Sequence, residues 1–141
     1  MSISVQNRTR ITDIIRRMDE YGSQAEPMKT CLGILAIMSR DEANKLVISR
    51  DGMETILNVM TLHVDKSDVQ EAGCDLLWSL AFGNSTVKEI IAKYGGASVL
   101  VRAVKRHGKS PEFLKSACGA LSSMQFLWEA QHSKAIASMG S

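Results

Sequence analysis

Apolar residues recur along this chain at the spacing of α-helices. The first set follows the order i, i+3, i+4 and i+7, with charged residues between its members: Ile11, Ile14, Ile15 and Met18. This spacing places the four side chains on one stripe of an amphipathic helix. Pro27 suits the first turn of a second helix. Residues 28–38 are apolar on nearly every face, so we expect this helix to be covered on both sides by other helices.

The rest of the chain repeats one order of helices twice. We expect helices over residues 41–50, 54–63 and 68–82 in the first copy, and over residues 85–94, 98–107 and 111–124 in the second. A glycine corner separates the first two helices of each copy, at Asp51 and Gly52 in one and at Gly95 and Gly96 in the other. Glycine suits such a corner because it adopts the left-handed conformation without a steric penalty.

Two landmarks indicate the same period. The three cysteines lie 43 and 44 residues apart, at Cys31, Cys74 and Cys118. The Ile-x-x-x-Gly corner recurs 43 and 45 residues apart, ending at Gly52, Gly95 and Gly140. Helical repeats of roughly 40–47 residues are typical of α-solenoids, in which each repeat buries its apolar side against its neighbours.

The third helix of each copy carries a family resemblance. The strings CDLLWSLA (74–81) and CGALSSM (118–124), together with the glycine corner, resemble armadillo repeats over about residues 4–140. The resemblance implies an all-α fold, a right-handed α-solenoid of about three armadillo-like repeats with incomplete terminal repeats. We expect one domain over 1–141, divided into a partial repeat (4–40), two repeats (41–83 and 84–126) and a partial repeat or cap (127–141).

Composition narrows the class of protein. Apolar residues make up 45% of the 141 residues and charged residues 23%, which favours a folded globular domain. The net charge of +2 is too small to indicate binding to a polyanion such as nucleic acid. Only 5% of residues are aromatic and two are proline, which argues against a β-sandwich. An odd number of cysteines, no signal peptide and no long apolar run predict a cytoplasmic protein without a membrane anchor, with a nuclear location left open.

The residues that could carry catalysis have structural interpretations. The cysteines could be nucleophiles or metal ligands, but their regular spacing without a CxxC partner favours core packing. His63 and His107 could be general bases, as could His132, but the first two occupy equivalent helix ends, which favours capping of those ends. Gly95 and Gly96 belong to no phosphate-binding motif. We therefore predict no enzyme activity, no cofactor and no metal site.

The armadillo resemblance implies a concave groove lined by the third helices, where a protein or peptide binds. The predicted binding residues are Glu71, Asp75, Trp78, Ser79, Lys115, Gly119, Ser122 and Ser123, with Met28, Leu32, Leu35 and Ala36 in the partial repeat 4–40. The repeated Trp and Asn of nuclear-import adaptors are missing at the aligned positions, which disfavours that function. Trp78 is either a binding anchor or a packing residue between repeats.

The two ends of the predicted array lack neighbours. We expect either self-association through the ends, making a homo-oligomer, or short terminal helices that act as caps. The candidate self-association residues are Ile11, Ile14, Ile15, Met18, Leu127, Trp128, Ile136 and Met139. We expect two clusters of basic residues to be solvent-exposed helix faces, and binding of an acidic partner is the alternative. Binding of nucleic acid is disfavoured because no aromatic residues alternate with these charges. The clusters are Arg8, Arg10, Arg16 and Arg17, and Arg102, Lys105, Arg106 and Lys109.

The sequence therefore predicts a non-enzymatic protein-interaction module, an adaptor or scaffold. The alternative is a regulatory armadillo domain excised from a larger multidomain enzyme such as a kinase. Neither reading identifies the partner, because armadillo repeats serve many unrelated functions.

Overall fold

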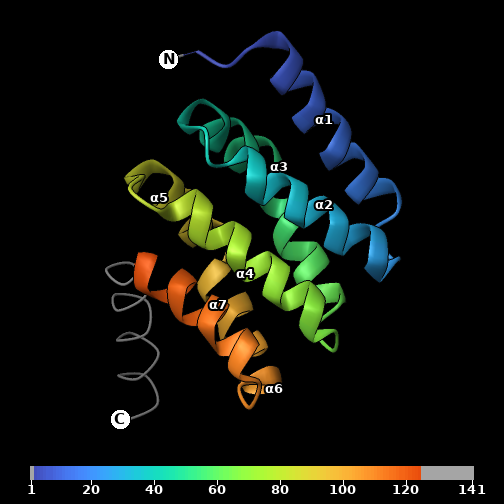
Figure 1. Cartoon of the computed structure of the whole chain (residues 1–141), viewed down its shortest axis with the longest axis vertical. Coiled ribbons are helices and arrows are strands. Elements are labelled where there is room, and N and C mark those ends of the chain that lie inside the picture. Colours follow the sequence, from blue (N-terminus) through green and yellow to red (C-terminus); the bar gives the residue numbers. More distant parts are fainter. Residues whose placement is uncertain (1, 125–141) are drawn as a thin grey trace.

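The computed structural model describes residues 2–124, and every regular element in that range is an α-helix (Figure 1). The helices are α1 (Val5–Glu20), α2 (Ala25–Met38), α3 (Glu42–Leu62), α4 (Ser67–Ala81), α5 (Ser85–Lys93), α6 (Gly96–His107) and α7 (Pro111–Ser123). The all-α prediction is confirmed.

Helix starts follow the capping residues of the sequence. Four helices begin after a residue whose side chain accepts a hydrogen bond from a backbone N–H of the first turn, at Ser4, Asp41, Asn84 and Ser110. Such caps contribute about 1 kcal/mol each because they satisfy amides that have no partner within the helix. Pro111 occupies the tolerated first turn of α7. Gly95 has φ +83° and joins α5 to α6, which confirms the predicted glycine corner there.

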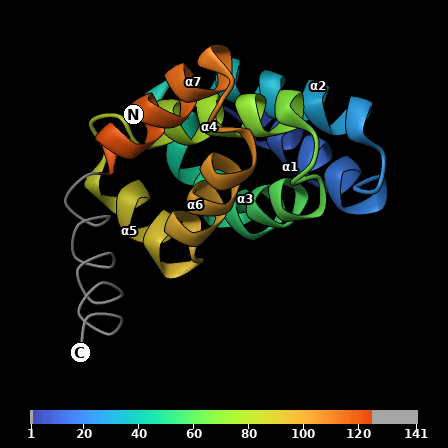
Figure 2. The ribbon, with the colours of Figure 1, turned by 90° about the horizontal axis from the view of Figure 1, so that it is seen from below.

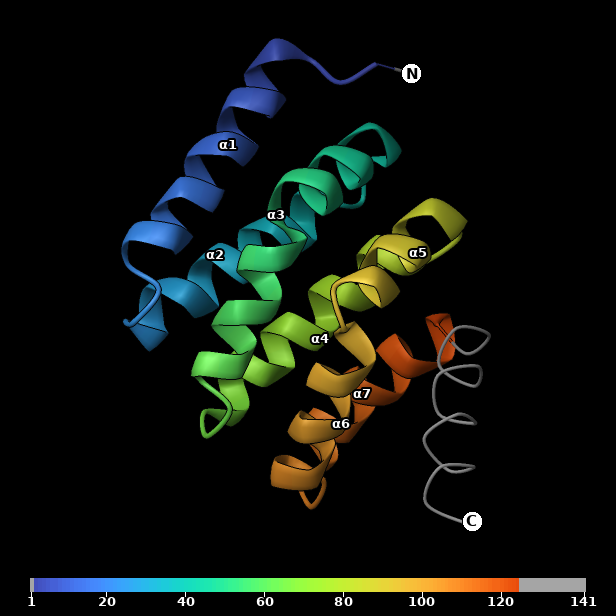
Figure 3. The same cartoon turned by 180° about the vertical axis from the view of Figure 1, so that it is seen from behind.

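The helices form two layers. Helices α2, α4 and α7 lie side by side in one layer, with α4 between the other two, while α1, α3, α5 and α6 form the second layer (Figures 1 and 2). Seen from the second-layer side, α3 lies between α1 and α5 (Figure 3). No helix in the described range is long and apolar enough to cross a membrane.

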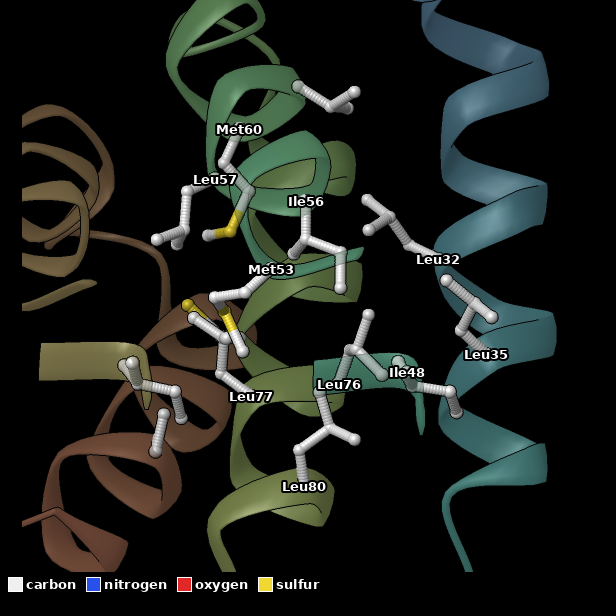
Figure 4. Close-up of a cluster of buried hydrophobic side chains, with 14 of the residues drawn as sticks. Leu32, Leu35, Ile48, Met53, Ile56, Leu57, Met60, Leu76, Leu77 and Leu80 are labelled. Carbon is white, nitrogen blue, oxygen red and sulfur yellow. The ribbon is translucent and has the colours of Figure 1, made fainter. Parts of the chain in front are cut away.

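The main core fills the space between the layers. Leu32 and Leu35 of α2 point toward Ile48 and Ile56 of α3 and toward Leu76 of α4 (Figure 4), and all five side chains are fully buried. Each fully buried side chain of this size stabilises the fold by roughly 1.5–3 kcal/mol relative to exposure.

The predicted corner at Asp51 and Gly52 is wrong. The two helices expected over 41–50 and 54–63 are one continuous helix, α3. Gly52 is buried within it, and a Cβ at this position would lie 2.8 Å from Cδ1 of Ile15. Glycine is therefore used here for the close approach of α1 to α3 rather than for a turn.

The alignment of α2 with α4 by their starts differs by one residue from the alignment that the cysteines predict. Helices α2, α4 and α7 begin at Ala25, Ser67 and Pro111, so their starts are 42 and 44 residues apart. A spacing of 42 aligns Cys31 with Gly73, not with Cys74. Successive residues of a helix are about 100° apart around its axis. A one-residue error in the alignment therefore assigns the α2 side chains to the wrong face of the helix.

Core packing of the cysteines is confirmed for two of the three. Cys31 and Cys74 are buried, whereas Cys118 is exposed on α7. Cys118 aligns with Cys74 at the spacing of 44, but the part of the chain that the structure describes places no neighbouring helix over it.

Burial differs from the expectations for the first two helices. The helix over 28–38 was expected to be covered on both sides, but Ile34 and Ile37 are exposed. Three of the candidate self-association residues on α1 are buried in the chain's own core: Ile11, Ile15 and Met18. They cannot form an exposed adhesive surface, and only Ile14 of that stripe is partly exposed. Both basic clusters are exposed, as predicted.

Several predictions fall outside the described residues. These concern the segment 127–141, the third glycine corner, His132 and the end residues Leu127, Trp128, Ile136 and Met139.

Candidate functional site

A groove runs between α2 and α4 near the carboxyl ends of both helices. It encloses about 850 Å³, within the size range of small-ligand sites. Its lining residues come from α2, α4 and the segments that follow them: Gly33, Ala36, Ile37, Ser39, Arg40, Glu42, Lys45, Ala72, Asp75, Trp78, Ser79 and Phe82. We call this surface the α2–α4 groove.

The structure brings four of the predicted binding residues to this groove: Ala36, Asp75, Trp78 and Ser79. Glu71 is half-buried on α4 and does not line the groove. The four predicted residues of α7 lie beyond Trp78, with Lys115 and Ser122 exposed and Gly119 and Ser123 half-buried.

Three residues of α2 that were predicted to line the groove are instead in the core: Met28, Leu32 and Leu35. The cause is the one-residue slip in register. Aligning α2 to α4 by their starts would have selected Gly33, Ala36 and Ile37 opposite Asp75, Trp78 and Ser79, and these three residues do line the groove. Lys45 and Glu42 were missed because no pattern in the sequence places the first turns of α3 beneath the end of α4.

Trp78 is both a packing residue and a groove residue. Its indole lies over Gly119 of α7, where a Cβ would overlap the ring. Even so, 38% of the residue remains exposed and it lines the α2–α4 groove. Ile37 and Phe82 are exposed by 61% and 68% on either side of the same groove. Large apolar side chains gathered around one hollow are typical of interaction sites.

Hydrogen bonds hold the floor of the groove in place. The Lys45 ammonium donates to the backbone oxygen of Phe82 at 2.9 Å and pairs with Glu42 at 2.8 Å, and its side chain is only 5% exposed. The hydroxyl groups of Ser39 and Ser79 are hydrogen-bonded at 2.5 Å. Because these contacts join α2, α3 and α4, they set the width of the groove.

The charges of the groove are separated. Lys45 and Glu42 compensate each other. Arg40 and Asp75 are exposed, and their side chains form no hydrogen bond or ion pair with another described residue. The groove therefore presents one available positive charge on the α2 side and one available negative charge on the α4 side.

His63 is the C-cap residue of α3 and His107 lies in the last turn of α6, as predicted, but both imidazole rings bind carbonyl groups of other segments of the chain. Nε2 of His63 lies 2.6 Å from the carbonyl oxygen of Gly22, and Nε2 of His107 lies 2.6 Å from that of Val64. A carbonyl only accepts hydrogen bonds, so Nε2 is the donor in both cases. These paired contacts are structural, and neither imidazole offers a free Nε2 as a base.

The buried thiols are poor nucleophiles. Burial, together with the nearby carboxylates of Asp75 and Glu71, raises the pKa of the Cys74 thiol to about 12. Burial also raises the pKa of Cys31, against the opposing effect of Arg17. Since the thiolate is the reactive form, buried thiols with raised pKa values react slowly.

We expect one fast-reacting thiol in the folded chain. At pH 8, a thiol reagent should modify Cys118 within the mixing phase, while Cys74 should react only on unfolding, because it is both inaccessible and protonated. The absorbance of the thiolate that the reagent releases measures the rate at which each cysteine reacts. Cys118→Ser should abolish the fast phase. Fast modification of Cys74, located by mass spectrometry, would contradict the burial of that helix face.

Compared with known proteins, the chain matches no family model, no curated sequence and no solved structure. Within residues 2–124 no group of three or more His, Cys, Asp or Glu side chains could hold a metal ion.

Proposed function

We propose that this chain is a non-enzymatic protein-interaction module, an adaptor or scaffold that binds a peptide segment of a partner in the α2–α4 groove. The observation that carries the proposal is the exposure of Ile37, Trp78 and Phe82 around a hollow whose floor is already hydrogen-bonded. A partner gains apolar contact there without having to break the polar contacts beneath it.

We further propose that the groove belongs to an armadillo-like solenoid. Three features support this: the two layers of helices, the starts of α2, α4 and α7 at 42 and 44 residues, and the matched contacts of His63 and His107 with preceding loops. In such an array each repeat packs against the repeat before it.

Trp78 is the expected anchor of the interaction. Its ring is held over Gly119, so little conformational entropy is lost when a partner covers it. Interface tryptophans in this setting commonly contribute 2 kcal/mol or more, which corresponds to about a 30-fold change in Kd.

We expect Trp78→Ala to weaken peptide binding more than it lowers stability. Peptides selected from a library of random short sequences on the immobilised chain provide the ligands, and calorimetric titration gives Kd. Trp78→Ala should raise Kd by about 30-fold or more, because the anchor is lost while Trp78 is only partly buried. Urea unfolding of the same variant gives the change in stability.

The matched control is Leu62→Ala, which removes an exposed apolar side chain at the end of α3, outside the groove. It should leave Kd unchanged. The proposal is contradicted if no peptide is selected, or if the selected peptides bind Trp78→Ala as tightly as the unaltered chain.

A further inference from the structure

Gly33 and Gly119 occupy the same position in their helices. Gly33 lies eight residues after the start of α2 at Ala25, and Gly119 lies eight residues after the start of α7 at Pro111. The two sites differ in what covers them. The indole of Trp78 fills the space above Gly119, whereas no atom of residues 2–124 outside the local helix lies within 4 Å of a Cβ built at Gly33.

The empty notch at Gly33 is not explained by the fold. Its φ is not positive, so the backbone does not require glycine. Glycine inside a helix costs about 1 kcal/mol relative to alanine, and none of the seven described helices approaches this position closely enough to need the missing side chain. The notch does line the α2–α4 groove.

We propose that the Gly33 notch receives an aromatic side chain of a partner peptide, with an acidic residue of the same peptide at Arg40. This inference rests on the proposed function and names the chemistry of the segment that the groove binds. Trp78 over Gly119 shows, within this chain, that a flat ring seats on a helix at this position when the residue is glycine.

The surroundings of the notch suit an aromatic ring. Ala36 and Ile37 follow Gly33 on the groove side of α2, and Trp78 and Phe82 line the groove from the α4 side. An aromatic ring seated on Gly33 gains apolar contact with the groove lining, and ring pairs add about 0.5–1.5 kcal/mol through edge or offset contacts.

Charge sets the direction of the peptide. Arg40 is the available positive group of the groove, since Lys45 is compensated by Glu42. Asp75 on the opposite helix is unpaired and repels a carboxylate. A peptide carboxylate is therefore attracted to the Arg40 side and kept from the Asp75 side, where a basic or neutral residue fits.

The test uses two variants of the groove and the peptides selected on the unaltered chain. Gly33→Leu fills the notch and should weaken binding at least tenfold, the loss expected when one aromatic side chain is no longer buried. Arg40→Glu should weaken binding of the same peptides, and a new selection on this variant should return peptides with a basic residue in place of the acidic one.

Asn58→Leu is the matched control, because it adds the same side chain at an exposed position of α3 that does not line the groove. It should leave Kd unchanged. Circular dichroism and urea unfolding should show Gly33→Leu folded and no less stable, since no described atom occupies the space that the leucine enters.

The outcomes separate this inference from the proposed function. Peptides that depend on Trp78 but bind Gly33→Leu and Arg40→Glu unchanged would overturn the inference and leave the function standing. Peptides that are insensitive to all three substitutions would overturn both. A concentration-dependent dimer, seen by light scattering and lost in Gly33→Leu, would place a second copy in the notch and overturn the assignment to a separate partner.

Discussion

We expect Phe113→Ala to lower the free energy of unfolding by about 3–5 kcal/mol, the range for removing a buried aromatic side chain. Phe113 is fully buried in α7, and its ring meets the edge of His107 with centroids 5.8 Å apart. Alanine leaves a cavity at the point where α6 and α7 meet. Urea unfolding followed by circular dichroism measures the loss as a lower midpoint at an unchanged slope.

Phe82→Ala makes the same chemical change at an exposed site, since Phe82 is not part of the core. It should alter stability by no more than about 0.5 kcal/mol. If Phe113→Ala leaves too little folded protein to measure, Phe113→Leu should show a smaller loss in the same direction. Equal effects of the two alanine substitutions would mean that α7 does not bury Phe113 in solution.

The second large effect is a pair of glycine substitutions with opposite signs. Gly119→Ala should lower the free energy of unfolding by about 1–3 kcal/mol, because the added methyl group overlaps the rigid ring of Trp78. Gly33→Ala should raise it by about 0.5–1 kcal/mol, because the methyl group meets no neighbour and alanine is the better helix former. Both values come from urea unfolding.

A third variant identifies the cause of the difference. With Trp78→Ala in the background, the clash at Gly119 is gone, so Gly119→Ala should become neutral or stabilising. The interaction energy from this double-mutant cycle reports the Trp78 contact directly. A Gly119→Ala effect that is unchanged when Trp78 is removed would show that another neighbour opposes the methyl group.

The sequence predicts most of the helices because their signals are local. Asn84, Ser110 and Pro111 mark helix starts through their own side chains, and Gly95 ends α5 through its own φ. Gly52 fails as a signal because the same residue type also serves close packing. Whether Gly52 bends the chain or admits Ile15 depends on a helix from elsewhere in the sequence.

The binding residues are predicted less well because they depend on register. The interval from α4 to α7 exceeds the interval from α2 to α4 by one residue before α5 and by one more residue between the starts of α5 and α7. The cysteine spacings of 43 and 44 conceal this difference. On α4, the predicted residues Asp75 and Trp78 do line the groove; on α2, the one-residue slip exchanged Gly33 and Ile37 for core residues.

The unbroken α3 also bears on how the molecule responds to load. Its 21 residues make a rod of about 32 Å, and both α1 and α4 pack on it. Bending there would require breaking main-chain hydrogen bonds, whereas bending at Gly95 requires only rotation about a glycine. Because α7 packs on α4 and Trp78 lies over Gly119, elastic deformation at that joint should change the angle between α5 and α6 while α1 to α4 and α7 move as one stiff body.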